Sequence, residues 1–498
     1  MPGKSLMIQG TGSHVGKSVI AAALCRIFRQ EGIDVAPFKS QNMSNNAFVC
    51  ASGGEIARSQ ALQAAACSLE PSVEMNPVLL KPCTDEGAQV IVRGRPAGVM
   101  KAKEYERFKP TLRPALLECL DSLRERHELV VIEGAGSPAE INLRKNDIAN
   151  MSVAALAGAP VILVGDIDFG GVFAQLIGTM HLLLEEERAR VLGFVINKFR
   201  GDMDILRPGL DYLEKETKRR VFGVVPYFGD IRLPEEDRIP ERNQIGAAGN
   251  DRVRIDVIRH PRIANFTDFD ALEAEPDVSL RYLDSPAVEI PDAILIPGTK
   301  STIPDLRRLK ETGFAAFVSH CRERGATIAG ICGGYQMMGR RISDPSRIES
   351  DAAEEEGLGL LPTETVFNER KRTALVRAIH IESGAEVDGY EIHMGETRGG
   401  ERPAFQLTER LGSKTRDMDG ASATGGRVWG TYIHGVFDSP AFRRHFINRL
   451  RAEKGMKPVA AAASIDLESD LDRLADRVRA ALDVDAILET VMSRKWTS

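Results

Sequence analysis

The segment Gly10–Ser18, GTGSHVGKS, combines glycines with a Lys-Ser pair and lies between an apolar run, SLMIQ, and a stretch with helical apolar spacing. Glycines there let backbone N–H groups converge on phosphate oxygens, and the N-terminus of the following helix adds its positive dipole. Lys17 would reach the outer phosphates, and Ser18 would ligand Mg²⁺. The segment predicts a nucleotide site; the alternative is a glycine-rich turn without nucleotide. The predicted ATP-binding residues are Gly10, Thr11, Gly12, Gly16, Lys17, Ser18 and Asn197.

The spacing of this loop and the acids at later strand ends refine the prediction. Counted back from the Lys-Ser pair, the first glycine of the common pattern should fall at Thr11, so Gly10 comes one residue early. A Mg²⁺ ion also needs an acid at a strand end. Glu133, which closes LVVIE, is the first candidate as its ligand together with the loop serine, ahead of Asp166 and Asp168.

The segment NKFRGD resembles the base-reading motif of GTPases. Arg200, however, occupies the position where the guanine-specific Asp of those proteins would lie. We therefore expect an adenine base, with Asn197 in contact with it.

A second reactive segment reads TIAGICGGYQMMG and places Cys332 between glycines after a short apolar run. A nucleophile at a tight strand-to-helix turn needs small neighbours, because its backbone is strained and its side chain projects into a cleft. The backbone N–H of Gly333 is suited to bind an oxyanion, and Gly298 in ILIPGTKST could supply a second donor. The alternative is that Cys332 is a small buried apolar residue.

A nucleophilic thiol needs a proton partner, and we expect it to be His434 in GTYIHGVF. This histidine follows a β-type run in the same half of the chain as Cys332. A lone histidine is often structural, and that alternative stays open.

Apolar, β-branched runs alternate with helical stretches along both halves of the 498-residue chain, which indicates parallel sheets covered by helices. We predict an α/β domain that carries the phosphate loop over residues 1–230, a charged linker over 231–251, a second α/β domain that carries Cys332 over 252–450, and a helical extension over 451–498. In that extension Leu467, Leu471, Leu474, Val478 and Leu482 share one helical face, which we expect to pack on a domain.

Composition narrows the function classes. A net charge of −6 argues against a nucleic-acid partner, because phosphate backbones are bound by concentrated Lys and Arg. The most apolar stretch, AALAGAPVILVG, is too short to span a membrane. The seven cysteines form no C-x-x-C pair, and an odd number fits reduced thiols. We expect a cytoplasmic protein that acts on small molecules, with an oligomer left open.

Together these segments resemble the triad-type glutamine amidotransferases, which hydrolyse glutamine at a cysteine and pass ammonia to a synthetase domain. More narrowly, the chain resembles the cobyric acid synthases, glutamine-dependent enzymes that amidate the corrin ring in cobalamin biosynthesis. The resemblance extends to about residue 450. It rests on GTGSHVGKS, PFKSQNMSNNAFV, MNPVLLKP, EGAGSPAEINL, DIANMSVA, VGDIDFGGVFA, VINKFRGD, LPEED, GICGGYQMMG, GYEIHMGET and GTYIHGVFD.

The resemblance implies a first domain similar in fold to dethiobiotin synthetase, which shares the longer loop spacing. It also implies ATP, Mg²⁺, glutamine as nitrogen donor, and an acyl-phosphate route. The family's substrate is adenosylcobyrinic acid a,c-diamide, amidated on its b, d, e and g side chains. In PFKSQNMSNN, Lys39 could stabilise charge on the transferring phosphoryl group, while Gln41 and Asn42 could bind the substrate.

One position departs from the wider amidotransferase pattern. Many relatives place a Glu two residues after the catalytic His, where this chain has Val436. Either Cys332 and His434 suffice as a dyad, or another carboxylate orients the imidazole, for which Glu391 in GYEIHMG is a candidate. The alternative for that loop is a structural role or a role in the glutamine pocket.

Two other functions stay open from the sequence. Cobyrinic acid a,c-diamide synthases share both chemistries and a related domain order, although PFKSQNMSNN and EGAGSPAEINL favour the cobyric branch. A P-loop switch protein would bind ATP without synthetase activity, but the second domain with its cysteine argues against it.

Overall fold

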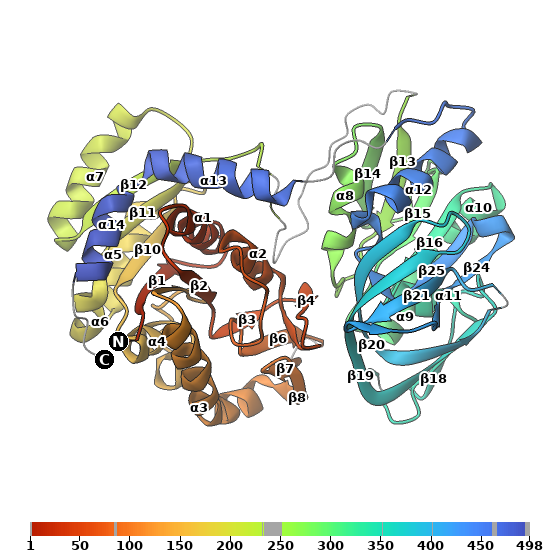
Figure 1. The fold of residues 1–498 in the computed structure, drawn as a ribbon, viewed down its shortest axis with the longest axis horizontal. Coiled ribbons are helices and arrows are strands. Elements are labelled where there is room, and N and C mark those ends of the chain that lie inside the picture. Colours follow the sequence, from red (N-terminus) through yellow and green to blue (C-terminus); the bar gives the residue numbers. More distant parts are fainter. Residues whose placement is uncertain are drawn as a thin grey trace.

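The computed structural model describes residues 2–83, 87–231, 233, 251–350, 352–400, 402–460 and 466–493. Two α/β bodies lie side by side along the long axis of the molecule (Figure 1). The predicted linker over 231–251 lies almost entirely outside the described residues. None of the helices in the described part of the chain has the length and apolarity that a membrane crossing requires.

The first body is built on a parallel sheet whose strands lie in the order β12-β11-β10-β1-β9-β2. The strands other than the edge strand β12 are short apolar runs buried on both faces, as expected for strands covered by helices on both sides. The parallel sheet predicted for this half is therefore present. Its strands are β1 (Lys4–Gly10), β2 (Val35–Phe38), β9 (Leu129–Glu133), β10 (Val161–Asp166), β11 (Val191–Phe199) and β12 (Arg220–Pro226).

Helices cover both faces of this sheet because alternate strand residues point in opposite directions. On β1, Leu6 and Ile8 pack in one apolar cluster, while Met7 packs in the cluster on the other face. Helix α1 begins at Lys17, directly after the glycine loop, and ends at Gln30, two residues before Gly32. The helices of the first body are α1 (Lys17–Gln30), α2 (Arg58–Ala66), α3 (Ala102–Arg126), α4 (Met151–Ala157), α5 (Val172–Leu182), α6 (Glu185–Arg190) and α7 (Met203–Thr217), with a short 3-10 turn at Arg144–Asn146.

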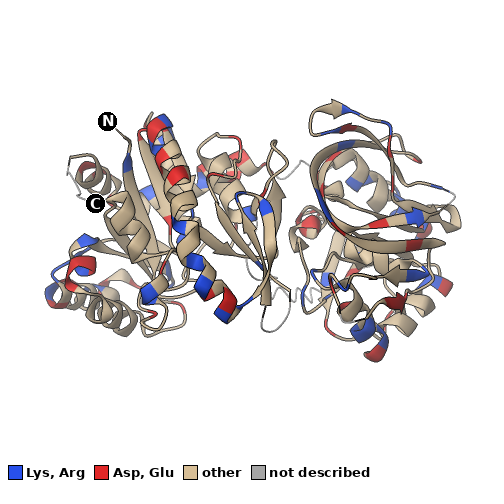
Figure 2. Cartoon of the chain, turned by 90° about the horizontal axis from the view of Figure 1, so that it is seen from below, with Lys and Arg blue, Asp and Glu red and all other residues tan. Residues whose placement is uncertain are grey.

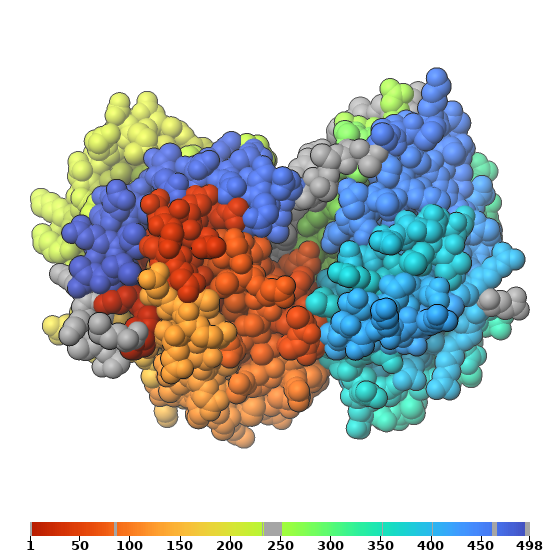
Figure 3. All heavy atoms as spheres, in the orientation of Figure 1, coloured from red at the N-terminus to blue at the C-terminus, as the bar shows by residue number. Residues whose placement is uncertain are grey.

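The C-terminal helices α13 (Leu467–Ala481) and α14 (Val484–Ser493) return to the first body after the second one is complete (Figure 1). Their buried residues, including Leu471 and Val478, join the apolar cluster of α1. The prediction that this helical stretch packs on a domain is confirmed. Figure 3 shows these helices in dark blue against the red N-terminal segments.

A small sheet and a hairpin project from the first body toward the second. Side chains of β6 alternate, so Val78 and Leu80 pack against α3, while Leu79 packs against Tyr390 and Ile392 of the second body. The chain thus builds a dedicated interface element into its first half. Its strands are β3 (Gln41–Met43), β6 (Val78–Pro82), β7 (Gly87–Val92) and β8 (Arg95–Lys101), with the hairpin β4 (Ala47–Val49) and β5 (Glu55–Ala57).

The second body has its own central sheet in the order β14-β13-β15-β16-β25-β24, parallel except for the pair β24–β25. Its strands are β13 (Val253–Ile258), β14 (Val278–Leu283), β15 (Ala293–Ile296), β16 (Thr327–Ile331), β24 (Ala421–Ala423) and β25 (Val428–Thr431). The helices around it are α8 (Asp270–Glu273), α9 (Thr302–Glu311), α10 (Phe314–Glu323), α11 (Gly333–Met338) and α12 (Pro440–Glu453), with 3-10 turns at Phe266–Phe269, Thr424–Gly426 and Val436–Asp438.

A largely antiparallel sheet packs beside this core. Its long strands β19 and β20 pair along most of their length, and β20 also pairs with β26, which carries His434. The strands are β17 (Arg341–Ser343), β18 (Glu354–Glu356), β19 (Thr363–His380), β20 (Glu386–Gly399), β21 (Phe405–Arg410), β22 (Ser413–Lys414), β23 (Met418–Asp419) and β26 (Ile433–His434). Basic and acidic residues are interspersed over the outer helices and strands of both bodies (Figure 2).

Candidate active site

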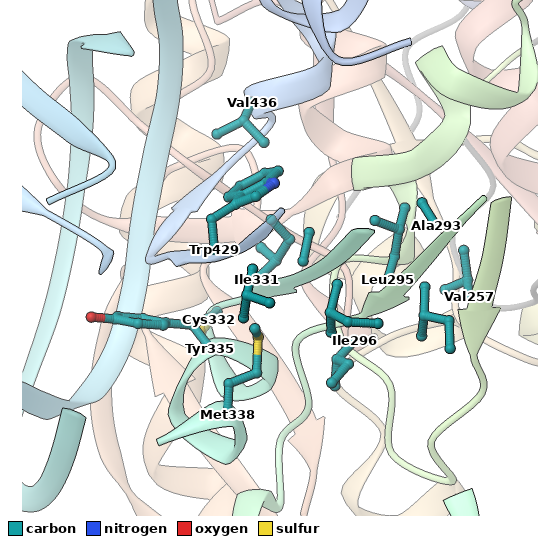
Figure 4. Close-up of a cluster of buried hydrophobic side chains, with 14 of the residues drawn as sticks. Val257, Ala293, Leu295, Ile296, Ile331, Cys332, Tyr335, Met338, Trp429 and Val436 are labelled. Atoms are coloured by element: carbon teal, nitrogen blue, oxygen red, sulfur yellow. The ribbon is translucent and has the colours of Figure 1, made fainter. Parts of the chain in front are cut away.

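Cys332 lies at the junction of β16 and α11, with φ 52° and ψ −109°. A side chain other than glycine in such a backbone conformation costs about 1–3 kcal/mol, and strained residues of this kind cluster at reactive sites. Figure 4 shows Cys332 at the end of β16, with Tyr335 and Met338 of α11 beside it. The structure therefore places this cysteine at the kind of turn that projects a nucleophile.

The glycines on either side of Cys332 are required by close packing. A Cβ at Gly334 would lie 1.9 Å from the carbonyl oxygen of Ile296, and a Cβ at Gly330 would lie 2.5 Å from Met338 Sδ. Both distances are far inside van der Waals contact. The turn can therefore seat α11 against β15 and β16 only with glycine at both positions.

His434 forms an ion pair with Asp268, whose Oδ2 atom lies 2.7 Å from His434 Nδ1. Both side chains are at most 2% exposed. Burial alone would lower the pKa of His434, but the charge and hydrogen bond of Asp268, with a further contribution from Cys332, raise it to about 10. The imidazole is therefore protonated at neutral pH and held in one orientation.

The candidate orienting carboxylate Glu391 is wrong. Its Oε2 atom accepts a hydrogen bond from Arg410 at 3.0 Å, and its Oε1 atom lies 4.0 Å from His393 Nε2, whereas the carboxylate bound to His434 is that of Asp268. Val436 is fully buried, and the carboxylate expected near it comes instead from Asp268, in the 3-10 turn Phe266–Phe269. Asp268 and His434 are 166 positions apart in the sequence. No local sequence motif therefore indicates that they pair.

The two glycines predicted to bind an oxyanion lie next to the nucleophile. A Cβ at Gly298 would lie 3.6 Å from Cys332 Cβ and 3.3 Å from His434 Cε1. A Cβ at Gly333 would lie 3.1 Å from the backbone nitrogen of Thr299. The loop after β15 therefore packs directly over the first turn of α11, with Gly298 beside both reactive side chains.

A cavity opens onto this site and reaches residues of both bodies. Cys332 and His434 contribute to its wall, together with the first body's Lys81. The remaining lining residues are Ala264, Asn265, Gly298, Thr299, Lys300, Thr302, Gln336, Glu349, Lys371, Ile392, His393 and Met394.

The phosphate loop of the first body joins β1 to α1, as predicted. Lys17 is buried, and its Nζ donates hydrogen bonds to the carbonyl oxygens of Gly12, at 2.7 Å, and Gly136, at 3.1 Å. Thr11 Oγ1 donates to Gln175 Oε1 at 3.0 Å. The lysine thus lies over the loop between the carboxyl ends of two neighbouring strands, β1 and β9.

Glu133 is the centre of a buried polar cluster beside this loop. It accepts hydrogen bonds from Ser18 Oγ at 2.8 Å, Lys39 Nζ at 2.9 Å and Gln63 Nε2 at 2.5 Å. Burial would raise the pKa of Glu133, but the Lys39 ammonium and the three donated bonds hold it below its ordinary value. The carboxylate is therefore charged, with a hydroxyl and an ammonium beside it at the end of β9.

Asn197 lies beneath the loop rather than at its mouth. Its Nδ2 atom donates to the carbonyl oxygen of Val15 at 2.9 Å, and a Cβ at Gly16 would lie 2.0 Å from the same atom. The amide thus supports the loop from below, and its predicted contact with the base stays a prediction. Asp166 and Asp168 were the other acids considered as Mg²⁺ ligands. Asp166 forms an ion pair with Lys198, and Asp168 forms one with Arg200.

Comparisons with known proteins find relatives of both bodies of the chain. Residues 6–240 match the family described as the CobQ/CobB/MinD/ParA nucleotide binding domain, and residues 254–442 match the CobB/CobQ-like glutamine amidotransferase domain. The chain is 48% identical to a cobyric acid synthase of Dehalococcoides mccartyi over 98% of each chain. It is 49% identical to a cobyric acid synthase of Clostridium acetobutylicum over 97% of each. The chain belongs to the cobyric acid synthase family.

Membership of the cobyric acid synthases confirms the predicted fold class, an α/β chain with an N-terminal P-loop parallel-sheet domain and a C-terminal α/β amidotransferase domain. We therefore call the two bodies the synthetase domain and the amidotransferase domain. The chain is an enzyme, a ligase that contains a glutamine amidotransferase domain. The cobyric branch is thus favoured over the a,c-diamide branch and over a P-loop switch protein.

The synthetase domain forms hydrogen bonds with the turn that carries Asp268. Asn46 Oδ1 accepts a hydrogen bond from the backbone nitrogen of Phe266 at 3.1 Å, and the backbone nitrogen of Ala47 donates to Asn265 Oδ1 at 2.9 Å. Asn265 Nδ2 in turn lies 3.3 Å from His434 Nε2. Asn265 therefore connects the backbone of the synthetase domain to the His434 imidazole.

Aromatic stacking adds a second link between the domains. The ring of Tyr390 stacks on His434 with centroids 5.2 Å apart and planes 20° apart, and Phe48 of the synthetase domain lies 6.1 Å from Tyr390. In Figure 3 the red-orange synthetase segments abut the cyan surface of the amidotransferase domain. Residues from PFKSQNMSNNAFV thus contact the residues that pack against His434.

Gln41 and Asn42, which were predicted to bind the substrate, differ in their burial and in their hydrogen-bond partners. Gln41 Oε1 accepts a hydrogen bond from the Tyr105 hydroxyl at 2.7 Å and is half-buried. Asn42 is buried, and its Nδ2 donates to Ser59 Oγ and Gln60 Oε1. Asn42 therefore orders the segment internally, and substrate contact by either residue stays a prediction.

Proposed function

We propose that the enzyme amidates the b, d, e and g carboxylates of adenosylcobyrinic acid a,c-diamide to give adenosylcobyric acid, with ATP and glutamine as co-substrates. The observation that carries this proposal is the joining of a Cys332–His434–Asp268 site to a P-loop site through one interface. A glutaminase joined in this way to a phosphate site suits the delivery of ammonia to an activated carboxylate. The work is divided between residues 1–230, which use ATP, and residues 252–450, which release ammonia.

In the amidotransferase domain, the Cys332 sulfur attacks the side-chain amide carbon of glutamine. The oxygen that becomes negative lies against the backbone N–H groups at Gly333 and Gly298, which stabilise it. His434 gives its proton to the departing nitrogen, and ammonia leaves a thioester on the sulfur. Water then hydrolyses the thioester to glutamate and returns the free thiol.

In the synthetase domain, a corrin carboxylate oxygen attacks the γ-phosphorus of ATP, and ADP leaves. Ammonia attacks the carbon of the resulting acyl phosphate, and inorganic phosphate departs to leave a carboxamide. A carboxylate needs this activation because its oxygen is otherwise a poor leaving group. Lys17 and Lys39 stabilise the charge on the transferring phosphoryl group.

Ser18 and Glu133 would hold Mg²⁺, because a hydroxyl and a charged carboxylate 2.8 Å apart at the phosphate loop are the hard oxygen ligands that this ion prefers. Among the described residues no group of three or more His, Cys, Asp or Glu side chains could hold a metal ion. That agrees with an ion bound mainly by phosphate oxygens and water. When bound, it neutralises phosphate charge.

We place the reaction in the cytoplasm, with corrin, glutamine and ATP as partners, no nucleic acid and no membrane, and with an oligomer left open. The seven cysteines are all free thiols, which suits a reducing compartment and a thiol nucleophile.

Product analysis tests the proposal. Purified enzyme with ATP, Mg²⁺, glutamine and adenosylcobyrinic acid a,c-diamide should give a corrin with four new carboxamides, located by mass spectrometry and NMR. Products confined to positions a and c, from cobyrinic acid, would instead establish the a,c-diamide activity. ATP hydrolysis without any new carboxamide would favour the switch protein.

A further inference from the structure

Three charged side chains meet in the domain interface beside the glutamine cavity. Lys81 and Glu55 belong to the synthetase domain, and Lys81 Nζ lies 2.5 Å from Glu55 Oε1. Lys371, on β19 of the amidotransferase domain, pairs with the other carboxylate oxygen of Glu55. The side chains of Lys81, Glu55 and Lys371 are 3%, 0% and 5% exposed. Charged groups so deeply buried are costly unless they are matched.

The charges in this cluster do not balance. Two ammonium groups share one carboxylate, and the further partner of Lys371 is the neutral amide oxygen of Gln89 at 3.2 Å. Burial, with the charges of Lys81 and Lys300 and against the attraction of Glu55, lowers the pKa of Lys371 to about 7. When both lysines are protonated, the cluster has one excess positive charge, which a small anion would neutralise.

The two lysines of the cluster lie at the cavity that contains Cys332. Lys81 and Lys371 both line the cavity that Cys332 and His434 line. Lys300 and Glu349 complete its charged wall, and Glu349 accepts a hydrogen bond from the backbone nitrogen of Thr302 at 3.2 Å. An anion bound at the two lysines would thus lie in the chamber that admits the amide to be hydrolysed.

We propose that Lys81 and Lys371 bind the α-carboxylate of glutamine, so that the amidotransferase pocket is completed by a lysine from the synthetase domain. The proposal rests on the glutaminase function proposed above. Glutamine carries its carboxylate at the end opposite its amide, so one ligand can contact both the lysines and the thiol. A carboxylate also accepts two charge-assisted hydrogen bonds, one from each ammonium.

One consequence is that glutamine selection depends on domain docking. Glu55 holds a lysine of each domain, and the hairpin and small sheet that carry Glu55 and Lys81 pack on Tyr390 and Ile392. An amidotransferase domain separated from its partner would lack half of the carboxylate site.

Labelling of Cys332 tests the proposal. 6-Diazo-5-oxonorleucine carries the α-carboxylate of glutamine, whereas iodoacetamide carries none. Lys81→Met and Lys371→Met should each raise the half-saturating concentration of the diazo reagent at least tenfold. The rate of labelling by iodoacetamide should stay within twofold of that of the unmodified enzyme. The KM for glutamine should rise together with the half-saturating concentration of the diazo reagent. Ser301→Ala, which removes an interdomain hydrogen bond to the carbonyl oxygen of Cys83, should change neither labelling rate beyond twofold.

Two results would overturn the proposal. Equal slowing of both reagents would mean that the cluster only joins the domains, and unchanged saturation would mean that the carboxylate binds elsewhere.

Because a methionine variant could fail to fold, unmodified enzyme supplies a second test. Glutamate should protect Cys332 from iodoacetamide at a concentration at least tenfold lower than 4-aminobutanoate, which lacks the α-carboxylate; equal protection would contradict us. If glutamine is not hydrolysed at all, the proposed function fails instead.

Discussion

Asp268 Oδ2 lies 2.7 Å from His434 Nδ1, and its other oxygen accepts a hydrogen bond from the backbone nitrogen of Gly435 at 3.0 Å. One carboxylate thus holds both the His434 imidazole and the backbone next to it. The turn that supplies Asp268 is itself bound by the synthetase domain through Phe266 and Asn265. The orientation of His434 therefore depends on the interface between the domains.

Replacing Asp268 by Asn should lower kcat for glutamine hydrolysis by about 10²–10³-fold, because the imidazolium loses its charged partner. Synthesis with added ammonia should change less than threefold. Glutamate release and corrin amidation measure the two activities separately. Glu391→Gln is the matched control, since Glu391 pairs with Arg410. A larger loss in that variant would restore Glu391 as the orienting acid.

Cys332→Ala should abolish synthesis from glutamine while leaving synthesis from ammonia within threefold of the unmodified enzyme. Lys17→Ala should stop synthesis from either nitrogen donor, because the phosphoryl group loses its charge partner. The measurement is corrin amidation with each donor in turn. Loss of both activities in a folded Cys332→Ala protein would place the cysteine outside a glutaminase.

Asn46→Ala should lower glutamine hydrolysis about tenfold although Asn46 belongs to the synthetase domain. The substitution leaves the backbone nitrogen of Phe266 without its acceptor and loosens the turn that carries Asp268. Ammonia-dependent synthesis provides the internal control, since it does not need the triad. Equal losses with both donors would show that Asn46 acts on the synthetase site instead.

Gly334→Ala should prevent normal folding of the amidotransferase domain, because its Cβ would lie 1.9 Å from the carbonyl oxygen of Ile296. Gly12→Ala is the contrasting variant, since its Cβ would meet no described atom within 4 Å. We expect it to unfold at the temperature of the unmodified enzyme and to change nucleotide affinity alone. Thermal unfolding and ATP binding distinguish the two. A soluble, glutaminase-active Gly334→Ala enzyme would contradict the packing argument.

The stability of the amidotransferase domain should fall as pH rises through about 7. Burial, against a hydrogen bond from Thr431, raises the pKa of Asp419 to about 7. A folded-state pKa above the unfolded one gives stability that is fully present at low pH and is lost as pH rises through the folded value. Asp419→Asn should remove this dependence. The thermal unfolding midpoints of the unmodified enzyme and of Asp419→Asn at pH 5.5 and 8.5 test this prediction. The same change with pH in both proteins would contradict the assignment of the pH dependence to Asp419.

The phosphate loop and the nucleophile turn were predictable because each is local. Backbone geometry at Gly10–Ser18 and around Cys332 requires small residues at consecutive positions, and such a requirement is written in a few adjacent letters. The apolar runs likewise indicated parallel strands, because strands buried on both faces need continuous apolar residues. His434 was predictable only in part, since the second half of the chain holds six of the nine histidines and only its place after a β-type run favoured this one.

The triad acid, the lysine pair and the domain coupling depend on the tertiary structure. Asp268 and His434 are 166 positions apart, and Lys371 and Glu55 are 316 apart. In a chain with 71 acidic and 65 basic residues, no spacing selects such pairs. They meet only when β20 pairs with β26 and the synthetase hairpin packs on Tyr390. A buried charge acquires its partner from whatever surface the folded chain brings against it, and that choice is made by packing.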